Sequence, residues 1–248
     1  MPGKIELFRS QVVSSGGGDI LKDASEIAID SVLSEGLLKE IPIVGTLVNI
    51  YKITKGVKEI VEIKKLAKFL SNLNDVSESE RKEFDEKLEH DDASKTEFYG
   101  RLLILIQNLD ELQKAEIVSN FFKLYIYNII TQSDFFRFAN IVNIGYLGDL
   151  MVLHYSLQQV KGLGRASEDN RNLLYNILVQ ENLYSLGLLR KKTEEELAKD
   201  KETPLPKHTN YFPTKTGEMF SFMMYYNEST LEGWKKNGHN FFNVNDKH

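Results

Sequence analysis

Cysteine is absent from this chain of 248 residues. Its absence excludes disulfides, thiolate zinc sites, iron–sulfur clusters and cysteine nucleophiles together, and it is typical of proteins in a reducing cytosol. An excess of positive charge is also absent, because 31 Lys and Arg stand against 36 Asp and Glu, a formal charge of −5. A protein that coats nucleic acid needs a surplus of bases to neutralise phosphates. Composition therefore argues against that class.

Long hydrophobic runs are absent too. The N-terminal residues contain no apolar stretch of signal-peptide length, so we predict no secretion signal. The most apolar segment, 41–53, is shorter than the roughly 20 residues that a membrane-spanning helix needs, and charged residues border it. We therefore predict a cytoplasmic protein, with a peripheral position at the inner membrane as the alternative.

Catalytic motifs are missing as well. The sequence has no G-x-x-x-x-G-K-[ST] phosphate loop and no G-x-S-x-G nucleophile elbow. His90 and the two aspartates after it are the best metal candidate, but an acidic, solvated turn explains them more simply. His154 lies in an apolar run, which favours a hydrogen-bonded core histidine over a general base. We predict no metal, no cofactor and no enzyme, with an active site assembled from distant residues as the open alternative.

Proline is scarce, and residues 43–203 contain none. Because proline breaks helices and punctuates loops, its absence favours long helices joined by short turns. After Pro42, apolar residues recur every three or four positions, which places them on one helical face. These residues are Ile50, Ile53, Val57, Ile60, Ile63, Ala67 and Leu70. We predict a long amphipathic helix here.

Capping patterns predict the helices that follow. Ser77 and Glu80 have the spacing of a capping box. The apolar run 98–109 predicts a central helix that its neighbours bury all round. Asp110 is the expected N-cap of a helix that ends near residue 130, and Ser133 or Asp134 is that of the next helix. The side chains expected to point inward are Phe84, Leu88, Val118, Phe121, Phe122, Tyr125, Ile126, Ile129, Phe135, Phe138, Ile141 and Val142.

These patterns predict a mainly α protein, a helical bundle followed by a small winged-helix-like α+β domain. A stretch rich in Gly, Ser, Asp and Asn, 161–170, marks the boundary between the two. The expected parts are a flexible N-terminal segment (1–24), the helical bundle (25–160), the winged-helix-like domain (165–226) and an aromatic C-terminal tail (227–248). We expect the tail, which contains Trp234, to dock on the body of the protein or on a partner.

The winged-helix-like pattern has two parts. A Leu-Gly-Leu-Leu turn, 186–189, follows a helix, and its Gly187 can take the left-handed conformation that ends that helix. Spaced residues then resemble the return of a wing: Tyr211, Thr214, Gly217 and Phe220. The predicted order is helix, short strand, long hairpin, short strand, helix. An ordinary helix cap followed by an ordinary loop is the alternative.

The layout as a whole resembles bacterial phage-exclusion proteins of the abortive-infection alpha type. The resemblance rests on the run GRLLILIQNLDELQKAEIV (100–118), the turn SDFFR (133–137), and the LGLL and TKTGEMF segments. It is a likeness of arrangement over most of the chain, and it places no active site on these residues. It implies a role in defence against phage, by halting or killing the infected cell.

Charge is distributed unevenly along the chain. Residues 46–70 contain six lysines and two glutamates, and residues 75–97 contain ten acids and four bases. Two antiparallel helices with complementary charges explain this pattern most simply. Alternatively, the lysine helix lies on an anionic membrane or on a partner and the acidic stretch masks it. The residues of this predicted lysine surface are Lys52, Lys55, Lys58, Lys64, Lys65 and Lys68.

Contact with nucleic acid has weaker support. Residues 165–189, which would include a recognition helix, carry a net charge of −1, and residues 190–218 carry +1. Major-groove proteins bring more bases to the flanking phosphates. The candidate contacts are Arg190, Lys191 and Lys192. We predict a non-catalytic interaction protein of phage defence that acts through a protein partner or by self-assembly, with a membrane-active effector (helix 41–70) and a winged-helix regulator as alternatives.

Overall fold

The computed structural model describes residues 62–88 except 63, 67, 71 and 74, and then residues 92–160, 176–200 and 211–237. This part of the chain is mainly helical, with one two-stranded antiparallel sheet, which confirms the predicted mainly α class. The chain divides into two compact units, Met1–Phe135 and Phe136–His248.

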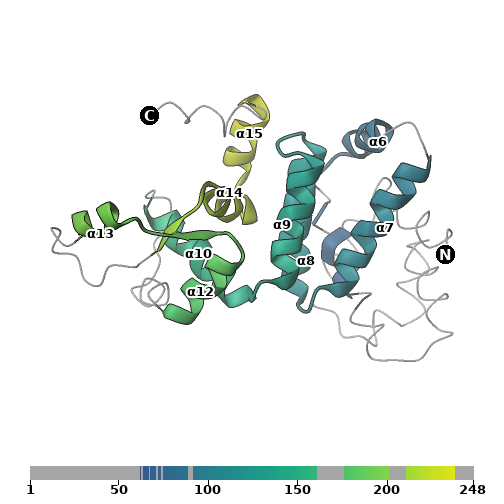
Figure 1. Ribbon diagram of the computed structural model, residues 1–248. Coiled ribbons are helices and arrows are strands. Elements are labelled where there is room, and N and C mark those ends of the chain that lie inside the picture. Colours follow the sequence, from purple (N-terminus) through teal and green to yellow (C-terminus); the bar gives the residue numbers. More distant parts are fainter. Residues whose placement is uncertain are drawn as a thin grey trace. The chain divides into compact units, whose positions relative to one another are not determined.

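In the first unit, the described residues between 62 and 70 are helical and precede three helices (Figure 1). These are α6 (Glu78–Lys87), α7 (Asp92–Asn108) and α8 (Leu112–Ile126), and α9 (Gln132–Ile144) begins in the same unit. The capping box of α6 is confirmed. The amide of Ser77 donates to the Glu80 carboxylate at 2.8 Å, and the amide of Glu80 donates to the Ser77 hydroxyl at 3.2 Å.

The predicted caps of α8 and α9 are wrong. Asp110 does not cap α8; its carboxylate pairs with Lys114 at 2.7 Å, a contact that lowers its pKa. At the start of α9, the hydroxyl of Thr131 accepts from the amide of Asp134 at 3.1 Å, and the Asp134 carboxylate accepts from the amide of Thr131 at 3.2 Å. The cap residue is therefore Thr131, and Asp134 is the third residue of a reciprocal capping box.

Aromatic side chains fill the core of the first unit. The ring of Phe122 lies 5.5 Å from the rings of Phe69, Phe84 and Phe135, which come from separate segments of the chain. All four side chains are buried, as are those predicted to point inward on α6 and α8, with Tyr125 half-buried. Aromatic contacts of this kind add stabilisation beyond the area they bury. The prediction for α7 is wrong in one respect, because Ile104 is 59% exposed, so the described residues do not bury this helix on all sides.

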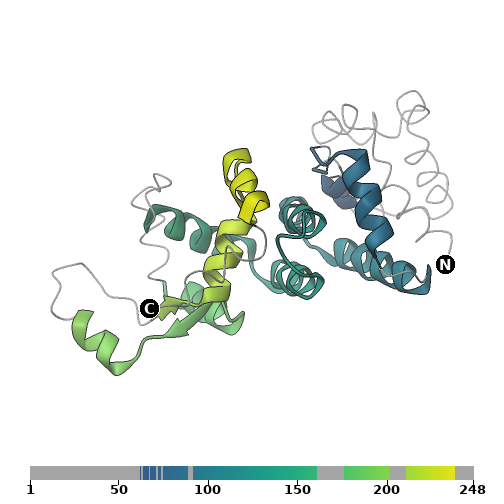
Figure 2. The ribbon, with the colours of Figure 1, turned by 90° about the horizontal axis from the view of Figure 1, so that it is seen from above.

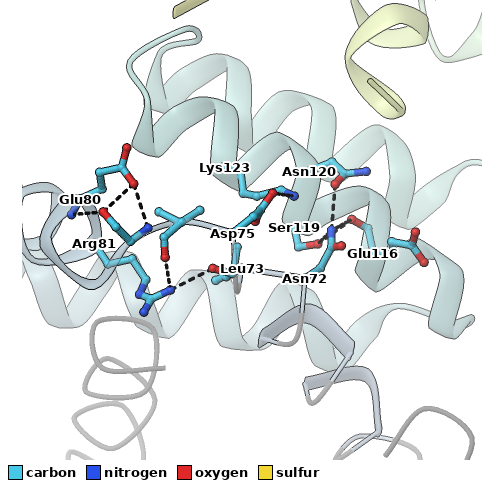
Figure 3. Close-up of polar contacts among 11 residues, drawn as sticks. Asn72, Leu73, Asp75, Glu80, Arg81, Glu116, Ser119, Asn120 and Lys123 are labelled. Carbon is cyan, nitrogen blue, oxygen red and sulfur yellow. Dashed lines mark hydrogen bonds and ion pairs between the residues drawn. The ribbon is translucent and has the colours of Figure 1, made fainter. Parts of the chain in front are cut away.

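Polar side chains fix the turn that leads into α6 (Figure 3). The side-chain nitrogen of Asn72, Nδ2, donates to the Ser119 hydroxyl at 2.6 Å and to the side-chain oxygen of Asn120 at 2.8 Å. Lys123 pairs with Asp75 at 2.9 Å. This network joins the turn to one face of α8, so we assign its residues a structural role.

The second unit contains the remainder of α9 and the elements that follow it (Figure 2). They are α10 (Leu147–Val160), α12 (Ile177–Ser185), β1 (Leu189–Lys191), α13 (Glu194–Asp200), β2 (Tyr211–Pro213), α14 (Lys215–Met224) and α15 (Glu228–Asn237). In the sheet, Leu189 pairs with Pro213, Arg190 with Phe212 and Lys191 with Tyr211. The predicted order of helix, strand, hairpin, strand and helix is confirmed, with the short helix α13 inside the hairpin.

The division between the units falls earlier than the predicted end of the bundle at residue 160. The reason is that α10 packs against α14 and α12, so it belongs to the second unit. The predicted C-terminal tail also includes a helix, since α15 covers residues 228–237. Trp234 on that helix is buried and its ring contacts that of Tyr226 at 5.4 Å.

The turn between α12 and β1 is held by Thr214. Gly187 adopts the predicted left-handed conformation, with φ of 72°. The hydroxyl of Thr214 donates to the carbonyl of Gly187 at 2.8 Å and accepts from the amide of Gly217 at 2.9 Å, which caps α14. The amide of Thr214 donates to the carbonyl of Leu188 at 3.0 Å. A Cβ at position 217 would lie 2.0 Å from that carbonyl oxygen, so the close approach requires glycine.

A buried histidine joins α10 to α14. Nδ1 of His154 lies 2.6 Å from the carbonyl oxygen of Ser221, and the imidazole contacts the ring of Tyr225 at 5.4 Å. Burial lowers the pKa of His154, and the hydrogen bond to Ser221 partly opposes this shift. The prediction of a hydrogen-bonded core histidine is confirmed.

Candidate interaction surface

Large apolar side chains are exposed mostly on the second unit. Among the residues that the structure describes, seven of the nine exposed large hydrophobic side chains belong to it. Isolated exposed apolar residues are normal on a protein surface, whereas a concentration of them indicates a binding surface. The seven are Ile144, Tyr146, Tyr155, Ile177, Leu178, Tyr184 and Phe212.

Helix α12 contributes three of these side chains. Ile177 is 56% exposed, Leu178 is 70% exposed and Tyr184 is 43% exposed. Its other side buries Val179 and Leu183 in the unit. Because helix positions seven apart share a face, Ile177 and Tyr184 lie along one exposed stripe with Glu181, which is also exposed, between them. We call Ile177, Leu178, Glu181 and Tyr184 the α12 face.

Residues of the sheet hold the C-terminal end of the α12 face in place. The buried Tyr211 on β2 donates its hydroxyl hydrogen to the carboxylate of Glu181, and this bond raises the pKa of Tyr211 to about 12. The rings of Tyr184 and Tyr211 lie 5.6 Å apart. The ammonium of Lys191 lies 5.3 Å from the centroid of the Tyr184 ring. One residue of each strand, Lys191 on β1 and Tyr211 on β2, thus supports the α12 face.

The opposite side of the sheet combines bases with an aromatic ring. Arg190 and Lys192 lie over the ring of Phe212, at 5.3 and 4.6 Å from its centroid. Arg190 also forms two hydrogen bonds with the carboxylate of Glu196, at 2.7 and 2.9 Å. This pairing lowers the pKa of Glu196 to about 2 and raises the pKa of Arg190. The charge of Arg190 is therefore balanced by a neighbour within the chain.

The three candidate nucleic-acid contacts are close together in the structure. Arg190, Lys191 and Lys192 follow one another along and just after β1, with alternate side chains on opposite sides of the sheet. The helix beside them contributes no base, because Glu181 is the one charged residue of α12. Proteins that dock a helix in the major groove bring bases on or around it. The sequence did not indicate the aromatic partners of these bases, since Phe212 meets Arg190 through the register of the two strands and Tyr184 meets Lys191 through the packing of α12 beside the sheet.

The predicted lysine surface is only partly described by the structure. Lys52, Lys55 and Lys58 lie outside the described residues, and Lys64 is half-exposed. The assignment of Lys65 to an exposed surface is wrong. Its side chain is buried, and its ammonium donates to the carbonyl oxygens of Gln107 and Leu109 at the end of α7, each at 2.5 Å.

The last residue of the lysine surface, Lys68, forms its ion pair with a residue outside the acidic stretch 75–97. Its ammonium lies 2.9 Å from the carboxylate of Glu116 on α8. The simpler prediction placed the lysine stretch beside the acidic residues 75–97. Where the structure describes this stretch, Lys65 and Lys68 instead contact the end of α7 and the side of α8.

The metal candidate at His90 lies outside the described residues. Within the residues that are described, no cluster of three or more His, Cys, Asp or Glu side chains has the arrangement of a metal site. None of the helices in the described ranges combines the length and the apolar character that crossing a membrane requires.

Neither a protein-family model, nor a curated protein, nor a solved structure matches this chain.

Proposed function

We propose that this chain is a non-catalytic interaction protein that works by protein contact through its second unit. The exposed α12 face carries the proposal, because Ile177, Leu178 and Tyr184 expose apolar area in the part of the chain that the structure describes, and contact with a protein partner would remove that area from water. In this proposal, α12, β1, β2 and α14 form a winged-helix-like element that binds protein. The resemblance to phage-exclusion proteins adds the setting, which is defence of a bacterium against phage.

Two features favour protein over DNA as the partner. The helix that would enter the groove has Glu181 as its charged residue, and Arg190, beside it on β1, is neutralised by Glu196. A phosphate backbone requires several unbalanced bases. The α12 face combines Ile177, Leu178 and Tyr184 with one charged residue, Glu181, and a surface rich in apolar and aromatic side chains and poor in charges is typical of the centre of a protein interface.

The alternative of a membrane-active effector has less support, because two lysines of its predicted lipid-facing surface make contacts within the first unit. An interfacial helix needs its lysines on the polar face toward lipid headgroups. Lys65 points into the first unit, and Lys68 is paired with Glu116. Protein contact through the second unit uses neither lysine.

A phage-plating experiment tests the proposed function. Bacteria that express the chain are challenged with a panel of phages, and the efficiency of plating is compared with that of cells carrying an empty vector. We expect the wild type to reduce plating of at least one phage. The double variant Ile177→Asp/Leu178→Asp should lose this protection, because two charges on the α12 face oppose burial in an interface.

The control is Ile104→Asp, which places the same charge at an exposed apolar position of the first unit. It should protect as well as the wild type. Thermal unfolding of the purified proteins establishes that each variant is folded. Normal plating on cells that express the wild type would contradict the role in defence, and full protection by the double variant would contradict the role of the α12 face.

A further inference from the structure

The register of the sheet fixes which backbone groups lie along the outer edge of β1. The amide of Thr214 donates to the carbonyl of Leu188, so these two residues form a hydrogen-bonded pair next to the first pair of the sheet. In an antiparallel ladder, hydrogen-bonded pairs alternate with pairs whose backbone groups point outward. The backbone N–H and C=O groups of Leu189 and Lys191 therefore point away from β2. An open row of such groups can pair with a strand of another chain.

The outer edge of β2 is closed by its own residues. By the same alternation, Tyr211 and Pro213 point their backbone groups away from β1. Pro213 has no N–H to donate, and Tyr211 is buried. Proline on an edge strand is one of the devices by which proteins prevent their sheets from joining.

The outer edge of β1 is closed by a contact with α13. Leu189 is buried, whereas Lys191, at the other end of the strand, is exposed. The guanidinium of Arg190 donates to the carbonyl oxygen of Lys191 at 3.2 Å. It also donates to the carboxylate of Glu196 on α13, at 2.7 and 2.9 Å. The carbonyl that an added strand would use at Lys191 is therefore occupied by a donor of the same chain.

The start of α13 holds Glu196 in place. The carboxylate of Glu196 accepts from the amide of Thr193 at 2.8 Å, and the hydroxyl of Thr193 accepts from the amide of Glu196 at 3.3 Å. This reciprocal capping box fixes the carboxylate within reach of Arg190. The planar fork of a guanidinium suits two parallel bonds to a carboxylate. The position of Arg190 over the edge of β1 thus depends on the first turn of α13.

We propose that the bonds from Arg190 to Glu196 and to the carbonyl of Lys191, which we call the α13 latch, block strand addition at the outer edge of β1. Together with Pro213 on the other strand, the latch keeps the sheet from pairing edge to edge with another chain. The inference does not use the α12 face and is therefore independent of the proposed function.

Sedimentation velocity of the full chain at low salt tests the latch. Glu196→Ala removes the carboxylate that holds Arg190, and at equal concentration it should at least double the fraction of chain in dimers and larger species. Glu194→Ala removes the same charge from the same turn of α13 and is the control, which should sediment as the wild type does. Equal association of Glu196→Ala and Glu194→Ala would overturn the proposal.

A second substitution shows whether the association uses the edge of β1. Lys191→Pro removes the N–H that this residue points away from β2. The double variant Glu196→Ala/Lys191→Pro should therefore lose the added association. If the double variant still associates as Glu196→Ala does, another surface is responsible and the proposal is wrong.

Arg190→Gln opens the latch from the side of β1. It leaves the capping box of Thr193 and Glu196 intact, so it tests the latch even if Glu196→Ala unwinds α13. Thermal unfolding establishes that each variant is folded. Folded Arg190→Gln should associate at least twice as much as the wild type, and association at the wild-type level would contradict the latch.

Discussion

Replacement of Gly217 by alanine should destabilise the second unit strongly. An added Cβ would lie 2.0 Å from the carbonyl oxygen of Leu188 and 2.9 Å from its carbonyl carbon, closer than the 3.0 Å that real Cβ atoms respect. The backbone at Leu188 or at Gly217 must therefore move by about 1 Å. This movement would disturb the hydrogen bond that the amide of Thr214 donates to the same oxygen. Overpacking typically costs about 1–3 kcal/mol and a lost hydrogen bond about 1 kcal/mol.

Alanine's better helix propensity offsets part of that cost, by about 1 kcal/mol. We therefore expect Gly217→Ala to lower the free energy of unfolding by about 2 kcal/mol, which corresponds to a fall in Tm of about 8 °C for a unit of this size. Thermal and urea unfolding followed by circular dichroism measure the change.

Two other glycines serve as controls for the same substitution. Gly233 lies in α15 with open space around its Cβ position, so Gly233→Ala should leave stability unchanged or raise it by about 0.5–1 kcal/mol. Gly187 has open space but φ of 72°, so Gly187→Ala should cost about 1–2 kcal/mol from backbone strain alone. Stability of Gly217→Ala equal to that of Gly233→Ala would refute the close approach of α14 to the turn.

Two further predictions concern buried polar groups. Lys65→Met should lower the free energy of unfolding, measured in urea, by about 1–3 kcal/mol, because it leaves two carbonyls at the end of α7 without their donor. Lys64→Met is the control and should have little effect. Equal effects of the two substitutions would contradict the capping of α7 by Lys65. His154 has a pKa below 6.5 in the folded state, so the unfolded chain binds its proton more readily and stability should fall as the pH drops from about 6.5 toward that lowered pKa. His154→Gln should reduce this pH dependence between pH 7.5 and 5.5, and an unchanged slope would assign it to other groups.

Local signals in the sequence predicted the helices well. The box formed by Ser77 and Glu80, the left-handed Gly187 and the buried faces of α6 and α8 depend on residues within one or two helical turns of each other. Caps were predicted less exactly. The Ser133 and Asp134 alternatives missed Thr131, because several neighbouring side chains could fill the cap position and tertiary packing decides where the helix begins.

Long-range contacts could not be predicted in this way. Lys65 looked like a surface lysine because its own helix supplies no partner, and the carbonyls that it caps are more than 40 residues away along the chain. The α12 face was missed for a related reason. Its residues continue an apolar pattern that sequence alone assigns to a core, and exposure becomes visible only when Val179 and Leu183 are seen to fill the inner side.

The bond between His154 and Ser221 has a consequence for synthesis of the chain on the ribosome. It joins residues that are 67 positions apart, and the helices that carry them, α10 and α14, cover each other in the finished unit. At about 5–20 residues per second, α10 leaves the ribosome several seconds before the helix that will bury it. During that interval His154 lacks the Ser221 carbonyl, and the part of α10 that α14 covers stays open to water, which exposes the nascent chain to aggregation until its last helices are made.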